Sequence, residues 1–223
     1  METLRAGCNP NAPPEARSQA RSGKTSWQAS AVRGMALTMR RLDPKECAVL
    51  IIDVQERLAS AMPAAQLAEL TRAASVLLEA AELLGAKVIA TEQYPAGLGR
   101  TLPILADRLA RIGAPTIEKI EFSACDNAAF ERARAATGAR AIIAVGMEAH
   151  VCVFQTVREL AARGIDVLVP LDGVASRRDD HRAAGLKLCR TSGATITTME
   201  SVVFDWLQRA GTDEFKRLSK LIR

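Results

Sequence analysis

Short apolar segments alternate with longer amphipathic segments along the chain from residue 46 onward. The pattern predicts strands, rich in β-branched residues, at 48–53, 87–91, 115–119, 141–145, 166–170 and 195–198. After the first of them, apolar residues recur at spacings of three and four, as on a helix face that packs against a sheet: Leu67, Leu70, Ala74, Leu77, Leu78 and Ala81. Further helices are predicted at 103–112, 126–137, 151–163, 179–192 and 200–209.

Regular alternation of strand and helix indicates an α/β fold. Strands that are apolar throughout are typical of a parallel sheet covered on both faces and joined by right-handed crossovers. We therefore predict a three-layer Rossmann-like fold with a six-stranded parallel sheet in the order 3-2-1-4-5-6. In this order a crevice opens between the carboxyl ends of strands one and four, and we expect the functional site there.

The first 40 residues follow a different pattern, because Asn, Pro, Ser, Arg and Gly are mixed there without apolar periodicity. Such a segment cannot offset the entropy of ordering. We predict a disordered N-terminal extension at 1–40 and one folded domain at 41–223. The extension resembles a transit peptide only weakly, so we expect a cytoplasmic protein, with the mitochondrial matrix as the alternative.

Composition narrows the classes of partner. Of the 223 residues 48% are hydrophobic, enough for one sizeable core, and no apolar run has the length of a membrane span. The formal charge of +5 lies in residues 1–41, which hold seven Lys/Arg and two Asp/Glu, whereas residues 42–223 hold 23 of each. A neutral body offers no clustered basic face, so we expect neither a nucleic-acid nor a membrane partner.

The five cysteines are widely spaced and form no CxxC pair. This argues against a disulfide framework and a cysteine zinc site, and favours a reducing compartment. Only His150 and His181 could supply imidazole, so we expect no metal and no cofactor. The chain also lacks a GxGxxG sequence after strand one and a GxxxxGK[ST] loop, which disfavours dinucleotide and P-loop enzymes.

Three residues at strand ends combine into a candidate catalytic site. Asp53 is the last residue of a buried strand, where an unpaired carboxylate would be costly; its alternative role is a helix cap. Cys152 begins the helix after strand four, where a helix N-terminus favours a thiolate and free N–H groups can bind an oxyanion; its alternative is an inert buried cysteine. Lys119 closes strand three, about 10 Å from strand one, and could hold Asp53 ionised; alternatively it is a solvated lysine.

These positions carry a family resemblance. Ile51-Ile52-Asp53-Val54-Gln55, Lys119 before Phe122-Ser123, and Gly146-Met147-Glu148 leading to Cys152 resemble the isochorismatase-like cysteine hydrolases over residues 44–210. The resemblance implies a catalytic triad of Asp53, Lys119 and Cys152. It also implies a cis bond between Met147 and Glu148, and an oxyanion hole formed by the N–H groups of Glu148 and Cys152.

The segment at 91–99, Thr-Glu-Gln-Tyr-Pro-Ala-Gly-Leu-Gly, is similar to the loop of the isochorismatase-domain-containing proteins of animals and their bacterial relatives. The equivalent loop of nicotinamidases supplies Asp and His to a metal, and this chain has no histidine before residue 150. The resemblance implies a substrate pocket that includes Gln55, Gln93, Tyr94 and Phe122. For Gln93 and Tyr94, loop packing is the alternative.

Cys152 moves the expected substrate toward amides and related carbonyl compounds, because true isochorismatases lack a cysteine in this place. We therefore expect a hydrolase that cleaves the C–N bond of a small amide. We also expect the protein to be a homo-oligomer. Asp53 is the expected base for the thiol, and His150, two residues from Cys152, is the rival. A catalytically silent scaffold and a thiol-based sensor are the alternative functions.

Overall fold

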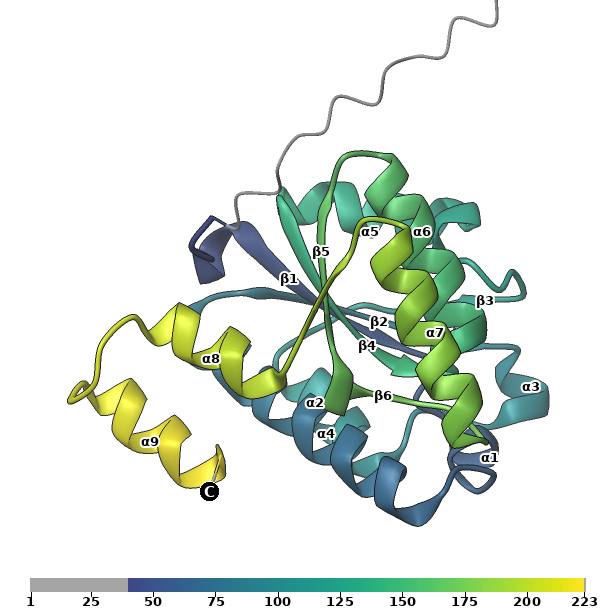
Figure 1. Cartoon of the computed structure of the whole chain (residues 1–223), viewed down its shortest axis with the longest axis horizontal. Coiled ribbons are helices and arrows are strands. Elements are labelled where there is room, and N and C mark those ends of the chain that lie inside the picture. The colour runs from purple at the N-terminus through teal and green to yellow at the C-terminus, as the bar shows by residue number, and fades with distance from the viewer. Residues whose placement is uncertain (1–39, 223) are drawn as a thin grey trace, which may run out of the picture. The chain divides into compact units, whose positions relative to one another are not determined.

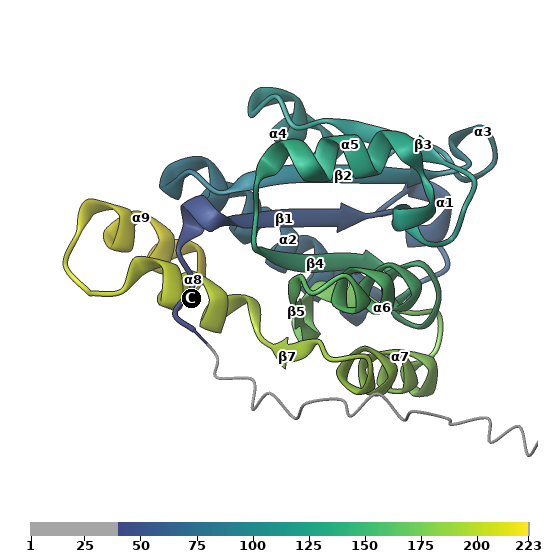
Figure 2. The same ribbon diagram turned by 90° about the horizontal axis from the view of Figure 1, so that it is seen from above.

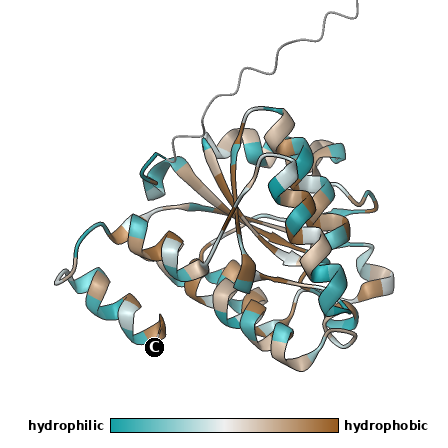
Figure 3. Cartoon of the chain, in the orientation of Figure 1, coloured by the Kyte–Doolittle hydropathy of each residue, from teal (hydrophilic) through white to brown (hydrophobic). Residues whose placement is uncertain are grey.

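The computed structural model describes residues 40–222. The predicted extension at 1–40 lies, apart from Arg40, outside the described residues. The two central strands are buried along their whole length, and the ribbon of the sheet is largely coloured hydrophobic in Figure 3. The strands are β1 (Cys47–Ile52), β2 (Lys87–Gln93), β3 (Thr116–Lys119), β4 (Ala141–Met147), β5 (Asp166–Pro170), β6 (Val174–Ala175) and β7 (Thr195–Thr197).

All strand pairs of the sheet are parallel, and the order is β3-β2-β1-β4-β5-β7 (Figure 2). This confirms the predicted fold class and order, since β7 is the sixth predicted strand. The two-residue β6 was not predicted; it pairs with β4 where β4 continues beyond β5. A strand of this length has too few residues for a period of two to be visible.

Helices cover both faces of the sheet (Figure 1). On one face, residues of α2, α4, α8 and α9 share a core with the odd-numbered residues of β1; on the other, residues of α5, α6 and α7 share a core with its even-numbered residues. The helices are α1 (Glu56–Ala59), α2 (Ala64–Leu84), α3 (Pro95–Leu98), α4 (Pro103–Arg111), α5 (Ala128–Thr137), α6 (Phe154–Ala162), α7 (Asp179–Thr191), α8 (Met199–Leu207) and α9 (Asp213–Ile222).

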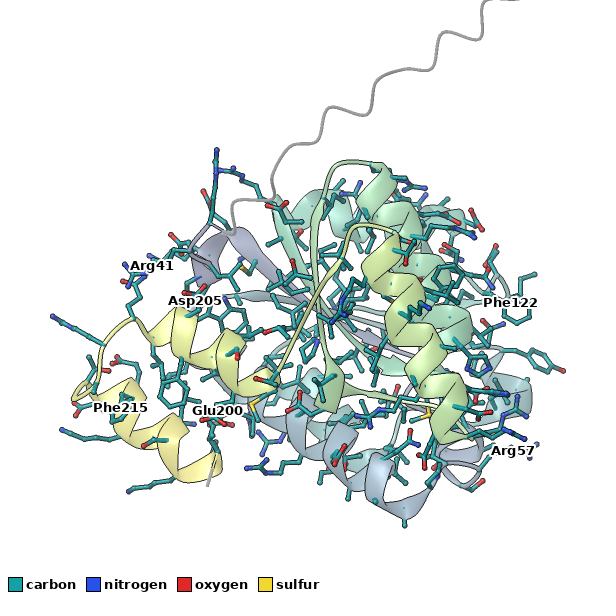
Figure 4. All side chains as sticks on the ribbon, viewed as in Figure 1. Arg41, Arg57, Phe122, Glu200, Asp205 and Phe215 are labelled. Atoms are coloured by element: carbon teal, nitrogen blue, oxygen red, sulfur yellow. The ribbon has the colours of Figure 1, made fainter. Side chains whose placement is uncertain are left out.

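Three helices were not predicted. α1 and α3 are single turns, which carry no recognisable period. α9 packs against α2 and α8, and Phe215 of α9, labelled in Figure 4, lies against Phe204 of α8, with ring centroids 6.2 Å apart. Leu218 is the only residue of α9 that is fully buried, so the helix depends on these neighbours. Within residues 40–222, no helix is long and apolar enough to cross a membrane.

Candidate active site

Asp53 lies directly beyond β1, at the carboxyl edge of the sheet. Its φ of 52° is in the left-handed region, which aspartate tolerates better than most residues. The prediction extended the strand through Asp53, whereas the structure ends it at Ile52. The side chain is fully buried, and Thr91 of β2 donates a hydrogen bond of 2.7 Å from Oγ1 to Asp53 Oδ1. The carboxylate is therefore held at the base of the site.

Lys119 ends β3, two strands from β1, and its ammonium reaches Asp53 across β2. Nζ lies 2.7 Å from Asp53 Oδ2, and both side chains are 0% exposed. It also donates to Gln93 Oε1 at 2.8 Å and to the carbonyls of Glu121 and Phe122 at 3.1 and 3.4 Å. A buried ion pair persists only where the remaining donors are also satisfied, and here all three N–H groups have acceptors. The structure thus pairs Lys119 with Asp53, instead of exposing it to solvent.

Cys152 lies in a π-helical turn, Ala149–Val153, which runs directly into α6. The pKa of its thiol is raised to about 12, because the upward shifts from burial and from the negative charge of Asp53 exceed the downward shift from the positive charge of Lys119. We expected a stabilised thiolate from the helix start and the lysine, and this expectation was wrong. Desolvation and the nearby carboxylate outweigh both, so the resting group is a neutral thiol.

The other described cysteines are similar in this respect. Burial raises the pKa of Cys47 to about 11, and those of Cys125 and Cys189 to about 12. Cys152 differs from them because Asp53 and Lys119 lie near it, and the charges of both change the pKa of its thiol.

The backbone before Cys152 has two special features. The Met147–Glu148 bond is cis, as the resemblance implied. Gly146 has a φ of 142°, and a Cβ there would lie 2.0 Å from the carbonyl oxygen of Ile52. Only glycine allows β4 to lie this close to β1 at Ile52, the residue that precedes Asp53. The Glu148 carboxylate accepts hydrogen bonds from the N–H and Nε of Arg177, at 3.0 and 3.1 Å.

The four residues expected in the pocket lie in different places. Gln55 is fully buried, and its amide bonds the backbone of Gln93 and Gly99, so it braces the loop after β2. Gln93 is 8% exposed and contacts Lys119. Tyr94 and Phe122 are more than half exposed, and Phe122 projects outward in Figure 4.

A cavity of ≈ 570 Å³ is lined by Tyr94, Lys119 and Ile120 among others; Asp53 and Cys152 do not line it.

His150 is engaged away from the thiol. Its Nδ1 lies 3.1 Å from Ser176 Oγ, and its ring lies 4.6 Å from that of His181. Burial lowers the pKa of His150, with Glu148 opposing the shift. The geometry therefore favours Asp53 over His150 as the group that serves Cys152.

Sequence reasoning missed Thr91, which binds the Asp53 carboxylate. The prediction ended this strand at Thr91, whereas β2 continues to Gln93, so that Thr91 and Gln93 are alternate residues that share a face. Among residues 40–222, no group of three His, Cys, Asp or Glu side chains could hold a metal ion.

The fold and site together define a three-layer α/β protein with a buried carboxylate–ammonium pair beside a cysteine at the carboxyl edge of the sheet. The family model of the isochorismatase domain matches residues 47–201. The chain belongs to the isochorismatase family, which confirms the resemblance and makes it a member of a superfamily of hydrolases.

Two curated relatives show the extent of the likeness. The secreted isochorismatase effector Isc1 of Phytophthora sojae is 34% identical over 82% of this chain and 87% of its own. Isochorismatase domain-containing protein 2 of Danio rerio is 31% identical, over 82% and 89%.

Solved structures agree on the fold. A structure of the MAR1 ribonuclease from Caenorhabditis elegans is 36% identical, covers 82% of this chain and 92% of that one, and has a TM-score of 0.75. YcaC of Escherichia coli, an octameric hydrolase of unknown specificity, has the same TM-score at 24% identity, over 81% and 90%. The second likeness concerns the fold alone.

Proposed function

We propose that the protein is a cysteine-dependent hydrolase of a small amide or related carbonyl substrate, with Cys152, Asp53 and Lys119 as its catalytic triad. The observation that carries the proposal is the buried Asp53–Lys119 pair, 2.7 Å apart, whose charges both act on the Cys152 thiol. A buried ion pair is seldom worth its desolvation for stability alone, and a charged pair beside a nucleophile suits catalysis.

The first half of the reaction is acyl transfer to sulfur. Because the thiol is neutral at rest, Asp53 takes its proton as the sulfur attacks the carbonyl carbon. The C=O π electrons move to oxygen, and the N–H groups of Glu148 and Cys152 bind that oxyanion. Asp53 then gives the proton to the amine nitrogen as the C–N bond breaks, which leaves a thioester on Cys152.

Water completes the cycle. Asp53 takes a proton from the attacking water, the thioester C–S bond breaks, and the proton returns to sulfur. Lys119 remains a fixed positive charge, because its three N–H groups are already occupied. Gln93, Tyr94 and Phe122 would border the substrate.

A thiol sensor is the less favoured alternative. Sensors use acidic, accessible thiols, whereas Cys152 is 5% exposed and its pKa is raised to about 12. A silent scaffold would have no need to keep the ion pair buried beside the cysteine.

Ammonia or amine release from a panel of small amides tests the proposal. A single-stranded RNA belongs in the panel, because a relative 36% identical is named a ribonuclease. We expect turnover of at least one amide by the wild type, none by Cys152→Ala, and no RNA cleavage. Amide turnover that survives Cys152→Ala, or cleavage of RNA alone, would contradict the assignment.

A further inference from the structure

Strand β2 lies between the two halves of the ion pair. The order β3-β2-β1 puts Asp53 after one neighbour of β2 and Lys119 at the end of the other. In the registers of these strands, Thr91 pairs with Ile52, the residue before Asp53, and Gln93 pairs with Lys119. Thr91 and Gln93 are alternate residues, so their side chains emerge on one face of the strand. The Asp53–Lys119 ion pair therefore crosses β2 at the side chains of Thr91 and Gln93.

Each of the two residues contacts one member of the pair. The Thr91 hydroxyl donates to Asp53 Oδ1 at 2.7 Å, while the Asp53 backbone N–H donates to the Thr91 carbonyl at 3.1 Å. Gln93 Oε1 accepts from Lys119 Nζ at 2.8 Å. Thr91 is 0% and Gln93 8% exposed. These contacts fix one carboxylate oxygen and one ammonium N–H before any substrate binds.

The orientation of the Gln93 amide is itself determined. Its Nε2 donates to the Ile120 carbonyl at 2.8 Å, so Oε1 must face Lys119; a flipped amide would set an NH₂ group against the ammonium. The Gln93 backbone is held as well, because its N–H donates to Gln55 Oε1 at 2.7 Å and its carbonyl accepts from Gln55 Nε2 at 3.0 Å. Gln93 is thus a rigid acceptor.

We propose that Thr91 and Gln93 are positioning residues, through which β2 sets the geometry of Asp53 and Lys119 beside Cys152. This inference rests on the proposed function and changes one part of it: Gln93 acts on Lys119 instead of binding substrate. Catalytic groups displaced by about 1 Å can lose roughly 10²-fold in rate, so such a support is worth having. Neither residue touches the reacting carbon in this scheme.

Steady-state hydrolysis of p-nitrophenyl acetate, an activated ester, provides the test. We expect Gln93→Leu to lower kcat roughly 10- to 100-fold with KM nearly unchanged, as for a lost hydrogen bond to a charged group. In a Lys119→Met background, Gln93→Leu should have no further effect, because its target is gone. Gln66→Leu is the matched control: Gln66 is a buried glutamine that bonds Asp179 and Ser176, and this change should leave kcat within about twofold.

Substitutions of Thr91 provide a second test. Thr91→Val keeps the shape of the side chain, so the packing around it is preserved. Thr91→Val should lower kcat roughly 10-fold, and Thr91→Ser, which retains the hydroxyl, should restore most of it. The proposal is overturned if Gln93→Leu raises KM alone, if its effect persists undiminished in Lys119→Met, or if Thr91→Ser is no better than Thr91→Val. Turnover that survives Cys152→Ala would instead refute the proposed function and, with it, this role.

Discussion

Asp53 and Lys119 act on the proton of Cys152 in opposite directions. The carboxylate raises the pKa of the thiol and the ammonium lowers it, and each effect is smaller than the upward shift from burial. A thiol with a pKa of about 12 carries its proton at neutral pH, so catalysis at this residue needs a partner that removes the proton during attack. Asp53 is fully buried beside it and is the partner that the structure offers.

The two charges can be separated by pH-dependent labelling. Asp53→Asn removes the charge that raises the pKa of Cys152, so the thiolate forms at lower pH and iodoacetamide labels this residue faster at about pH 9. Lys119→Met removes the charge that lowers the pKa, so labelling slows. Peptide mapping after timed exposure measures both rates. The interpretation fails if the two variants shift the labelling curve in the same direction.

Turnover gives the second prediction at this scale. Asp53→Asn preserves shape but cannot accept a proton, so we expect kcat to fall by about 10² to 10⁴ while substrate binding persists. Cys152→Ala should be inactive, and the double variant no worse than the poorer single one, because the residues act as a unit. An Asp53→Asn variant with most of the wild-type turnover would make Asp53 a structural residue, and His150 the next base to test.

Helix α7 packs against the Ala149–Val153 turn, in which Cys152 lies. Gly185 of α7 is buried, and a Cβ there would lie 2.6 Å from the carbonyl of Ala149 and 2.7 Å from the N–H nitrogen of His150. Helix α7 can approach the Ala149–Val153 turn, which holds Cys152, only because residue 185 has no side chain.

Gly185→Ala should therefore push α7 away from the turn. We expect a cost of about 1–3 kcal/mol in the free energy of unfolding, as for other overpacked sites, together with reduced turnover. Urea unfolding monitored by circular dichroism measures the first effect. The exposed Ala183→Ser change on the same helix is the control. Full stability and turnover in Gly185→Ala would show that the two elements can separate without consequence.

Glu79 of α2 joins α4 and α9 through arginines. Its carboxylate binds Arg108 at 2.7 Å and also pairs with Arg217. Burial opposes ionisation of Glu79, but the hydrogen bonds and charges of Arg217 and Arg108 outweigh it and lower its pKa below 4.5. A lowered folded-state pKa stabilises the protein above the unfolded value, and this contribution is lost as pH falls through the folded value.

Glu79→Gln should cost about 1–3 kcal/mol near neutral pH, the usual value for hydrogen bonds to a charged group. The difference from wild type should shrink as the pH falls below about 4.5, where Glu79 of the unfolded chain begins to bind protons, and should be lost once the pH falls through the lower folded-state pKa. Thermal unfolding at a series of pH values measures it, with the exposed Glu200→Gln as control (Figure 4). A difference that is constant with pH would exclude the ion pairs as the cause.

For the whole molecule, the sequence pattern predicts that the domain is independent of its N-terminal extension. Residues 1–38 have no apolar period with which to contribute to a core. Deleting them should change the melting temperature by no more than about 2 °C, less than the usual effect of 1 kcal/mol in a domain of this size. Calorimetry of the full-length and shortened chains measures this, and a large drop would show that the segment docks.

Much of the architecture could be predicted because it depends on the spacing of apolar residues within short segments of the chain. Spacings of two and of three to four separate strands from helices, and the alternation of the two restricts the sheet to a few topologies. The carboxyl edge of β1 and β4 followed from that order, which is why Asp53 and Cys152 could be assigned to one place. Elements shorter than one period, such as β6, and α9, which is stabilised by its neighbours, were not recognised.

The sequence by itself therefore determined which segments form the sheet and which chemical groups reach its carboxyl edge. Only the tertiary structure decided what those groups experience there. The pairing of β2 with both neighbours brings Thr91 to Asp53 and Gln93 to Lys119, and burial makes Cys152 a neutral thiol. The physical reason is that hydrogen bonding and desolvation depend on distances through space, between residues that the chain separates by up to about a hundred positions.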